Sequence, residues 1–334
     1  MNRNAGAFTL IELLVVLTIL AILTAVAVTS VDGFQDQSRY EATQRGLQNI
    51  SDAILGPQNQ HDSSGNPFVS GFVTDMGRLP RAIDHDSDSS TPLQPAELWI
   101  NPYPAVSFSI RPADTTNIPV ADVALADAEV KVPCGWRGPY LRLAAGETIL
   151  RDGWGRPFEL LKLTNVSNNR VLILATDSDV EREIKIFRSL GADAILSTAP
   201  SEDYKDDLYL NIATDAFPMP AYPIASASNL FKAAFTVTVH QTTLGNGPTG
   251  SVELRLFGPN PDTGLIKPLS ASLTGAGAPV VFTFDDAPTG TAPFTRVTIG
   301  TRVLRAYNGA NKSVPQVIVV TQSGPANIDL ILKP

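Results

Sequence analysis

The sequence is poor in cysteine and in basic charge, and several common catalytic motifs are missing from it. Its single cysteine, Cys134, excludes an intrachain disulfide and a cysteine-rich zinc site. The 25 Lys and Arg residues are outnumbered by 33 Asp and Glu, for a net charge of −8, whereas nucleic-acid binders normally carry a basic face. The G-x-S-x-G, P-loop and H-E-x-x-H motifs are absent. We therefore expect no nucleic-acid partner and no enzyme of these classes.

The few residues of a catalytic or metal-binding type are isolated from one another. His61, His85 and His240 lie far apart in the sequence, and each fits a loop or strand surface better than a ligand role. Cys134 precedes a Gly-Trp pair and is more typical of a small buried hydrophobe than of a nucleophile. The sequence therefore indicates a protein that is not an enzyme.

Long apolar runs are also scarce, and the one present lies at the N-terminus. Residues 8–28 read FTLIELLVVLTILAILTAVAV, with Glu12 as their one charge. As a helix this run would be about 31 Å long, which matches the hydrocarbon core of a bilayer. The short leader before it carries Arg3, so the positive-inside rule predicts a cytoplasmic N-terminus. A secreted protein cleaved after Ala-Val-Ala at 25–27 stays open as an alternative.

A charged carboxylate at Glu12 would raise the free energy of placing this helix in a bilayer, unless the side chain becomes protonated or pairs with a cation. The string F-T-L-I-E behind a short basic leader resembles the class III signal of type IV pilins and type II secretion pseudopilins. The resemblance implies that prepilin peptidase cleaves between Ala7 and Phe8 and methylates the new amine of Phe8. It also implies that Glu12 is the assembly glutamate, which meets the N-terminus of a neighbouring subunit in a helical filament. The implied partners are further copies of the chain, other pseudopilins, the peptidase and the inner-membrane assembly platform.

The helix is expected to continue beyond the membrane as a stem. Phe34, Leu47, Ile50 and Ile54 recur at roughly helical spacing among polar residues, which predicts one packing face. The Gly-Pro pair at 56–57 is a stop signal. A helix of this length, about 70 Å, is typical of a pilin and of few ordinary globular proteins.

The segment 57–130 reads as loops, and RDGWGRPFEL at 151–160 follows it. This run resembles the D-x-W-G-x-P-[YF] element that opens the sheet of major pseudopilins. Its glycines allow a tight turn, and its aromatic residues are large enough to anchor a sheet on the stem. The residues that match the motif are Asp152, Trp154, Gly155 and Pro157. An aromatic turn of any β protein is the alternative interpretation.

Strands are predicted at 156–163 and 170–176, the second apolar enough to be buried. The acidic stretch 187–212 then resembles the calcium loop of pseudopilins, although Ala194 stands where the family has glycine. Carboxylates are suitable calcium ligands. The predicted ligands of this calcium cofactor are Asp193, Asp203, Asp206 and Asp207. A solvated acidic loop without metal remains the alternative.

After a proline-rich stretch the apolar pattern takes a period of two. Residues 235–240 and 251–256 alternate clearly, and further short runs are separated by Gly, Pro and Asn. Strands at this spacing predict a β-sandwich, weakly similar to transthyretin-like or Ig-like modules. A resemblance of this kind does not specify a ligand.

The sequence therefore predicts an α+β protein, in which a long transmembrane and amphipathic helix packs on an antiparallel sheet and an all-β sandwich follows. The expected parts are a leader (1–7), a transmembrane helix (8–28), a stem (29–56), a pseudopilin-like domain (57–216), a linker (217–229) and the sandwich (230–334). The resemblance implies a pseudopilus or related filament subunit in the bacterial inner membrane, with its globular part periplasmic or extracellular. A pilus or minor pilin with an adhesive or ligand-binding domain, and a membrane-anchored surface binding protein, are the alternatives.

Overall fold

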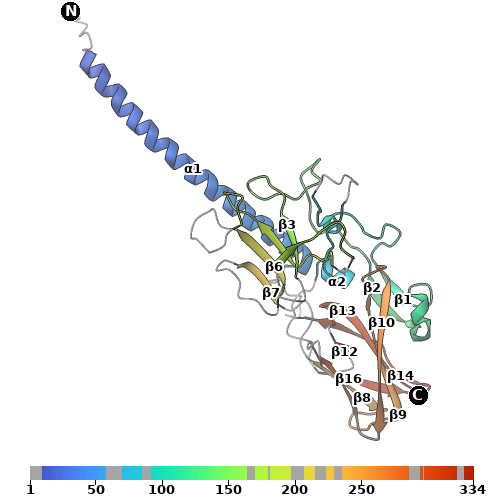
Figure 1. Cartoon of the computed structure of the whole chain (residues 1–334). Coiled ribbons are helices and arrows are strands. Elements are labelled where there is room, and N and C mark those ends of the chain that lie inside the picture. Colours follow the sequence, from blue (N-terminus) through green and yellow to red (C-terminus); the bar gives the residue numbers. More distant parts are fainter. Residues whose placement is uncertain are drawn as a thin grey trace, which may run out of the picture.

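The computed structural model describes residues 10–57, 70–84, 92–163, 170–179, 181–196, 207–214, 223–228, 235–285, 294–295, 297–321 and 327–334. One long helix, α1 (Leu10–Leu55), projects from the globular part, with the N-terminus at its far end (Figure 1). The C-terminal strands lie at the opposite end of the molecule. A helix followed by a large β region confirms the predicted α+β class.

Helix α1 has 46 residues and is about 69 Å long at the standard rise. Its last turns are buried, with Leu47, Ile50 and Ile54 fully inaccessible. Phe34 was expected on the same face but is 72% exposed, because the globular part covers only the later turns. Gly56 ends the helix at a positive φ of 80° and donates its N–H to the Asp52 carbonyl, as the Gly-Pro stop signal predicts.

A five-stranded sheet packs on these last turns. It contains β3 (Glu159–Leu163), β4 (Arg170–Leu172), β5 (Ile186–Ser189), β6 (Leu208–Thr214) and β7 (Pro223–Ser228), in the order β4-β3-β5-β6-β7. Neighbouring strands are antiparallel except for the parallel pair β6–β7. The core between helix and sheet also takes in the short helix α2 (Phe72–Met76).

Two predictions about this sheet are wrong. Residues 223–228, placed in the linker because they follow a proline-rich stretch, form β7, because backbone pairing with β6 outweighs the local signal. Residues 170–176, expected to be buried, have Ile173 inside but Leu174 55% exposed. In the described part of the sheet, β4 pairs with β3 alone, so it lies at an edge and exposes part of its apolar surface.

The segment expected to be loops contains regular structure besides α2, and only its later part belongs to a different core, since Leu98 still packs in the core beside α1. It holds η1 (Ala96–Leu98), β1 (Ser109–Ala113), η2 (Val120–Leu125) and β2 (Asp127–Cys134), with β1 and β2 antiparallel. Val130 and Val132 of β2 pack with Phe257, Ile266 and Val303 of the C-terminal strands. Only partners distant in sequence complete this core, so a local pattern does not predict it.

The C-terminal region forms one hydrogen-bonded sheet of nine described strands. They are β8 (Phe235–Gln241), β9 (Thr249–Pro259), β10 (Ile266–Ala276), β11 (Val280–Asp285), β12 (Phe294–Thr295), β13 (Gly300–Asn308), β14 (Asn311–Ser313), β15 (Gln316–Val320) and β16 (Ile328–Lys333). Their order is β10-β9-β13-β14-β16-β8-β11-β12, with β15 on β13. Apolar residues from β8, β9, β11, β13, β15 and β16 share one core, so this sheet curves around a common interior.

Candidate functional site

The start of α1, residues 10–24, is apolar and exposed on every side. All residues from 10 to 24 are exposed, and the large apolar side chains among them have between 46% and 82% of their surface accessible. The two threonines of this stretch satisfy their hydroxyls within the helix. Thr18 donates to the Leu14 carbonyl over 2.8 Å, and Thr24 donates to the Leu20 carbonyl over 2.7 Å. The segment therefore presents an apolar surface with little unmet hydrogen-bonding demand.

Glu12 lies in the first turn of α1 and is exposed among these apolar residues. An acidic residue in the first turn is favourable to the helix, since the N-terminus carries partial positive charge. Ala7 and Phe8, the predicted cleavage junction, lie outside the described residues.

Within the described ranges, no helix combines the length and the apolar character needed to cross a membrane. The predicted membrane segment 8–28 begins before the first described residue and stays a prediction.

Asp152 organises the turn that precedes the five-stranded sheet. One carboxylate oxygen accepts the backbone N–H groups of Trp154 and Arg156, over 3.0 and 2.8 Å. The other accepts the hydroxyl of Ser189, in β5, over 2.7 Å. The side chain is buried, so these bonds replace its lost hydration. The predicted motif residue therefore closes its own turn and fastens it to β5.

The same turn contacts the helix through Gly153. Its N–H donates to the Thr43 hydroxyl of α1 over 2.8 Å. A Cβ built on Gly153 would lie 2.0 Å from the carbonyl oxygen of Arg39, so only glycine permits this approach. The sequence motif indicated a tight turn but gave no sign of Thr43, because this partner is 110 positions away.

The remaining motif residues complete the junction. Gly155 has a φ of +80°, which glycine adopts without strain, and Pro157 forms an isolated bridge with Arg151. Trp154 packs at the margin of the core that contains Phe158. The turn thus joins helix α1, strand β5 and the sheet core at one place.

Only two of the four predicted calcium ligands, Asp193 and Asp207, lie among the described residues. Asp193 is exposed and accepts the Ile195 N–H over 2.9 Å. Asp207 is buried directly before β6 and accepts the Tyr209 hydroxyl over 2.9 Å. Asp203 and Asp206 lie outside the described residues. Among the residues that are described, no three His, Cys, Asp or Glu side chains gather in a way that would hold a metal ion.

A buried ionic cluster links the helix-bearing part to the C-terminal sheet, and sequence reasoning missed it. Arg78, after α2, makes two hydrogen bonds to Glu97, over 2.6 and 2.8 Å. Its Nε donates to the Pro261 carbonyl between β9 and β10, over 2.8 Å. Burial lowers the pKa of Arg78, but the hydrogen bonds and charge of Glu97 outweigh this, so the pKa is raised. No sequence signal identifies this cluster, since Arg78, Glu97 and Pro261 come from three separate segments of the chain.

Asp75 of α2 lies beside this cluster. It accepts the Tyr140 hydroxyl over 2.8 Å and forms an ion pair with Arg137 over 3.0 Å. Burial raises the pKa of the Asp75 carboxyl, and the hydrogen bond from Tyr140 and the charges of Arg137 and Arg302 oppose that shift only in part.

Comparison with known proteins identifies one feature of the chain. Residues 2–28 match the prokaryotic N-terminal methylation motif. No curated protein and no solved structure matches the chain. The matched segment contains the predicted cleavage junction, Phe8 and Glu12, so the predicted resemblance to type IV pilins and pseudopilins is confirmed there. A motif of this kind indicates a pilin-like precursor that prepilin peptidase processes, and the family that carries it is a structural one.

Proposed function

We propose that the chain is a subunit of a helical filament of the type II secretion pseudopilus class, anchored and assembled through α1. The observation that supports this most strongly is the exposed apolar surface of residues 10–24 of α1, which lie within the methylation motif. Monomeric soluble proteins rarely leave a continuous apolar surface of this extent in water. A bilayer would cover it before assembly, and the helices of neighbouring subunits would cover it in the filament.

In this proposal residues 8–28 span the inner membrane with a cytoplasmic N-terminus, and the globular part is periplasmic or extracellular. Prepilin peptidase removes residues 1–7 and methylates Phe8. Glu12 of one subunit then neutralises the Phe8 amine of an incoming subunit. Attraction between these charges is far stronger in apolar surroundings than in water, which explains how a carboxylate is tolerated in this helix.

Two observations favour a secretion pseudopilus over a pilus. The Asp152 turn carries the motif of major pseudopilins, and the chain has no disulfide of the kind common in adhesive pilins. A pilus or minor pilin whose C-terminal β domain binds a ligand is the second candidate, favoured by a separate core in that region. A monomeric membrane-anchored binding protein is a third candidate.

Substitution of Glu12 tests the proposal. Glu12→Ala should leave cleavage and membrane insertion intact but strongly reduce the filaments recovered by shearing. Glu41→Ala is the matched control, because Glu41 is an exposed acidic residue of the same helix outside residues 10–24. Mass spectrometry of the membrane-extracted protein should find a methylated Phe8 as first residue. Normal filament yield from Glu12→Ala, or a mature chain that begins after Ala27, would contradict the proposal.

We also propose that the acidic segment binds calcium through Asp193, Asp203, Asp206 and Asp207. A ligand that binds only the folded state raises its stability by mass action. The full chain in detergent should therefore melt at a higher temperature in millimolar calcium than in chelator, and Asp193→Ala should abolish the difference. If calcium left the melting temperature of the unsubstituted chain unchanged, the acidic segment would be solvated and would bind no metal.

A further inference from the structure

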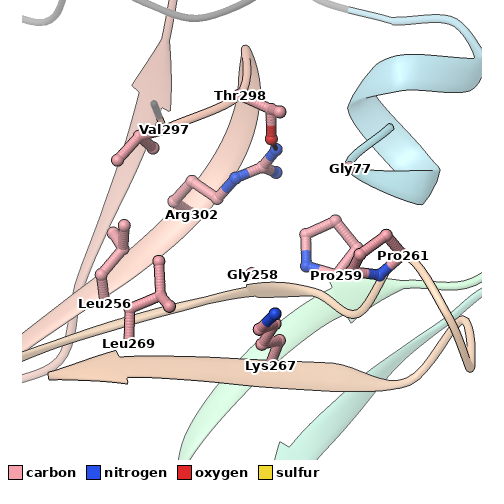
Figure 2. A pocket seen from close by; sticks show the side chains of 10 residues that line it. All are labelled: Gly77, Leu256, Gly258, Pro259, Pro261, Lys267, Leu269, Val297, Thr298 and Arg302. Atoms are coloured by element: carbon pink, nitrogen blue, oxygen red, sulfur yellow. Dashed lines mark hydrogen bonds between the residues drawn. The ribbon is translucent and has the colours of Figure 1, made fainter. Parts of the chain in front are cut away.

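A small pocket opens where the C-terminal sheet meets α2. Its volume is about 160 Å³, which exceeds the roughly 10–15 Å³ needed by one buried water. Its walls are mostly apolar, and Figure 2 shows Lys267 of β10 and Arg302 of β13 beside the same space. The lining residues are Gly77, Leu256, Gly258, Pro259, Pro261, Lys267, Leu269, Val297, Thr298 and Arg302.

Strand register places the two cations in one row across three strands. Lys267 of β10 pairs with Gly258 of β9, and Val303 of β13 pairs with Phe257. The neighbouring position on β13 is Arg302, which therefore lies opposite Gly258. A Cβ on Gly258 would come within 2.8 Å of the Arg302 Cδ, so the Arg302 side chain crosses the strand where glycine leaves room. The absent side chain at Gly258 creates the space between the cations.

No carboxylate contacts Arg302 among the described residues, although its side chain is buried and only 3% of the residue is exposed. Its hydrogen bonds go to uncharged groups. They are the carbonyls of Thr74, Ile299 and Thr301 and the hydroxyl of Thr298. Burial lowers the pKa of Arg302 to about 10, and the charge of Asp75 opposes this only in part. The guanidinium is thus charged at neutral pH without a contacting negative group, which is costly in an interior.

The acids around the pocket have other cationic partners. Asp75 pairs with Arg137, and Glu97 pairs with Arg78. Asp262, in the loop before β10, pairs with Arg81. Lys267 is exposed and forms no ion pair with a described residue. Two cations therefore share one face of the sheet, with Gly258 between them and no contacting carboxylate among the described residues.

We propose that this pocket binds a carboxylate with a short aliphatic body, held between Lys267 and Arg302. The anion would compensate the buried charge of Arg302, and Leu256, Leu269 and Val297 would cover its methylene groups. The Nη atoms of Arg302 already have acceptors, so few donors remain, and this favours a monoanionic carboxylate over phosphate. The volume suits a small acid rather than a cofactor, since ordinary ligand pockets hold 300–1,000 Å³. This inference does not depend on filament assembly.

Ligand-detected saturation-transfer NMR on the full chain in deuterated detergent tests the proposal, with butyrate as the probe and butyramide as its neutral counterpart. Butyrate should give a saturable signal and butyramide little or none. Lys267→Gln should weaken butyrate binding about tenfold, because one charge-assisted contact is lost. Lys267→Arg should retain binding. Lys333→Gln removes another exposed lysine of the C-terminal sheet and should leave binding unchanged.

Three results would overturn the assignment. Equal signals from butyrate and butyramide would mean partition into detergent or an apolar surface. Equal losses in Lys267→Gln and Lys333→Gln would mean a diffuse charge effect. If inorganic phosphate displaced butyrate from the pocket and bound more tightly than butyrate does, the pocket would be a general anion site without aliphatic selectivity.

Discussion

The backbone N–H of Gly153 donates to the hydroxyl of Thr43, and this bond of 2.8 Å joins the turn before β3 to the last third of α1. Thr43 is the first buried residue of α1 among those whose exposure is described. It therefore marks where the projecting helix is fastened to the globular part.

Adding one methyl group at this contact should push helix and turn apart. Gly153→Ala places a Cβ 2.0 Å from the Arg39 carbonyl oxygen, and overpacking of this kind costs roughly 1–3 kcal/mol. Gly46→Ala, on the same helix, meets only Phe158 at 3.8 Å and should stabilise the helix by about 0.5–1 kcal/mol. Thermal unfolding followed by near-UV circular dichroism measures both. A similar effect of the two substitutions would show that the close approach does not matter.

Asp152 should contribute more to stability than its partner Ser189. Asp152→Ala removes the acceptor for two backbone N–H groups and one hydroxyl, and we expect a loss of about 2–4 kcal/mol. Ser189→Ala removes a single bond and should cost about 1–2 kcal/mol. Denaturant unfolding of the full chain compares them. Equal losses would mean that the backbone bonds of the turn contribute little.

Ala194 is held in a left-handed conformation, with a φ of 60°, at the position where the pseudopilin motif has glycine. Such a conformation costs a residue with a Cβ about 1–2 kcal/mol. Ala194→Gly should therefore stabilise the protein by roughly 0.5–1 kcal/mol, even after the greater freedom of glycine in the unfolded chain is counted. Ala192→Gly, where φ is not positive, should destabilise it instead. A melting temperature lowered by both substitutions would contradict this account.

Asp75 should make stability fall as pH rises through the acidic range. Its folded-state pKa is raised, mainly by burial, so the folded protein binds a proton more tightly than the unfolded chain. The resulting stability is fully present below the unfolded pKa and is lost as pH rises through the folded pKa.

Melting temperatures of the unsubstituted chain and of Asp75→Asn, measured from acidic to neutral pH, isolate this contribution. The difference between the two should change across that range. Tyr140→Phe removes a hydrogen bond that lowers the pKa of Asp75 and should move the change to higher pH. A constant difference at every pH would exclude titration of Asp75.

Sequence patterns predicted the helices and strands whose formation depends mainly on their own residues and least on distant strands or helices. The Gly-Pro stop ends α1 after Leu55, and the alternating run at 235–240 lies in β8. Strand β10 was missed because its small and polar residues, IKPLSASLTGA, show no clear alternation, and it forms by pairing with β9 along its whole length. Position in the sheet also decides exposure, as Leu174 illustrates beside the edge strand β4. Register, edges and distant partners are properties of the assembled chain.

The residues of the candidate site also fall into those that the sequence predicts and those that only the fold reveals. The apolar run, Glu12 and the Asp152 turn were visible because each occupies a few consecutive residues. Thr43, Arg78 and the row of Lys267 and Arg302 were not, since each acquires its role from a strand or helix far along the chain. A sequence motif can identify a turn, whereas the side chain that receives its hydrogen bond depends on the fold.

The core shared by β2 and the C-terminal sheet decides how this chain can be divided. Val132 packs with Phe257 and Val303, and Arg305 reaches back to Asp127 of β2 over 2.8 Å. A cut between β7 and β8 would expose apolar surface on both pieces and leave charged groups without partners. The C-terminal β domain is therefore not expected to fold independently of β2. A proteolytic fragment or a shortened gene that ends at this boundary would carry an open core and would be expected to aggregate.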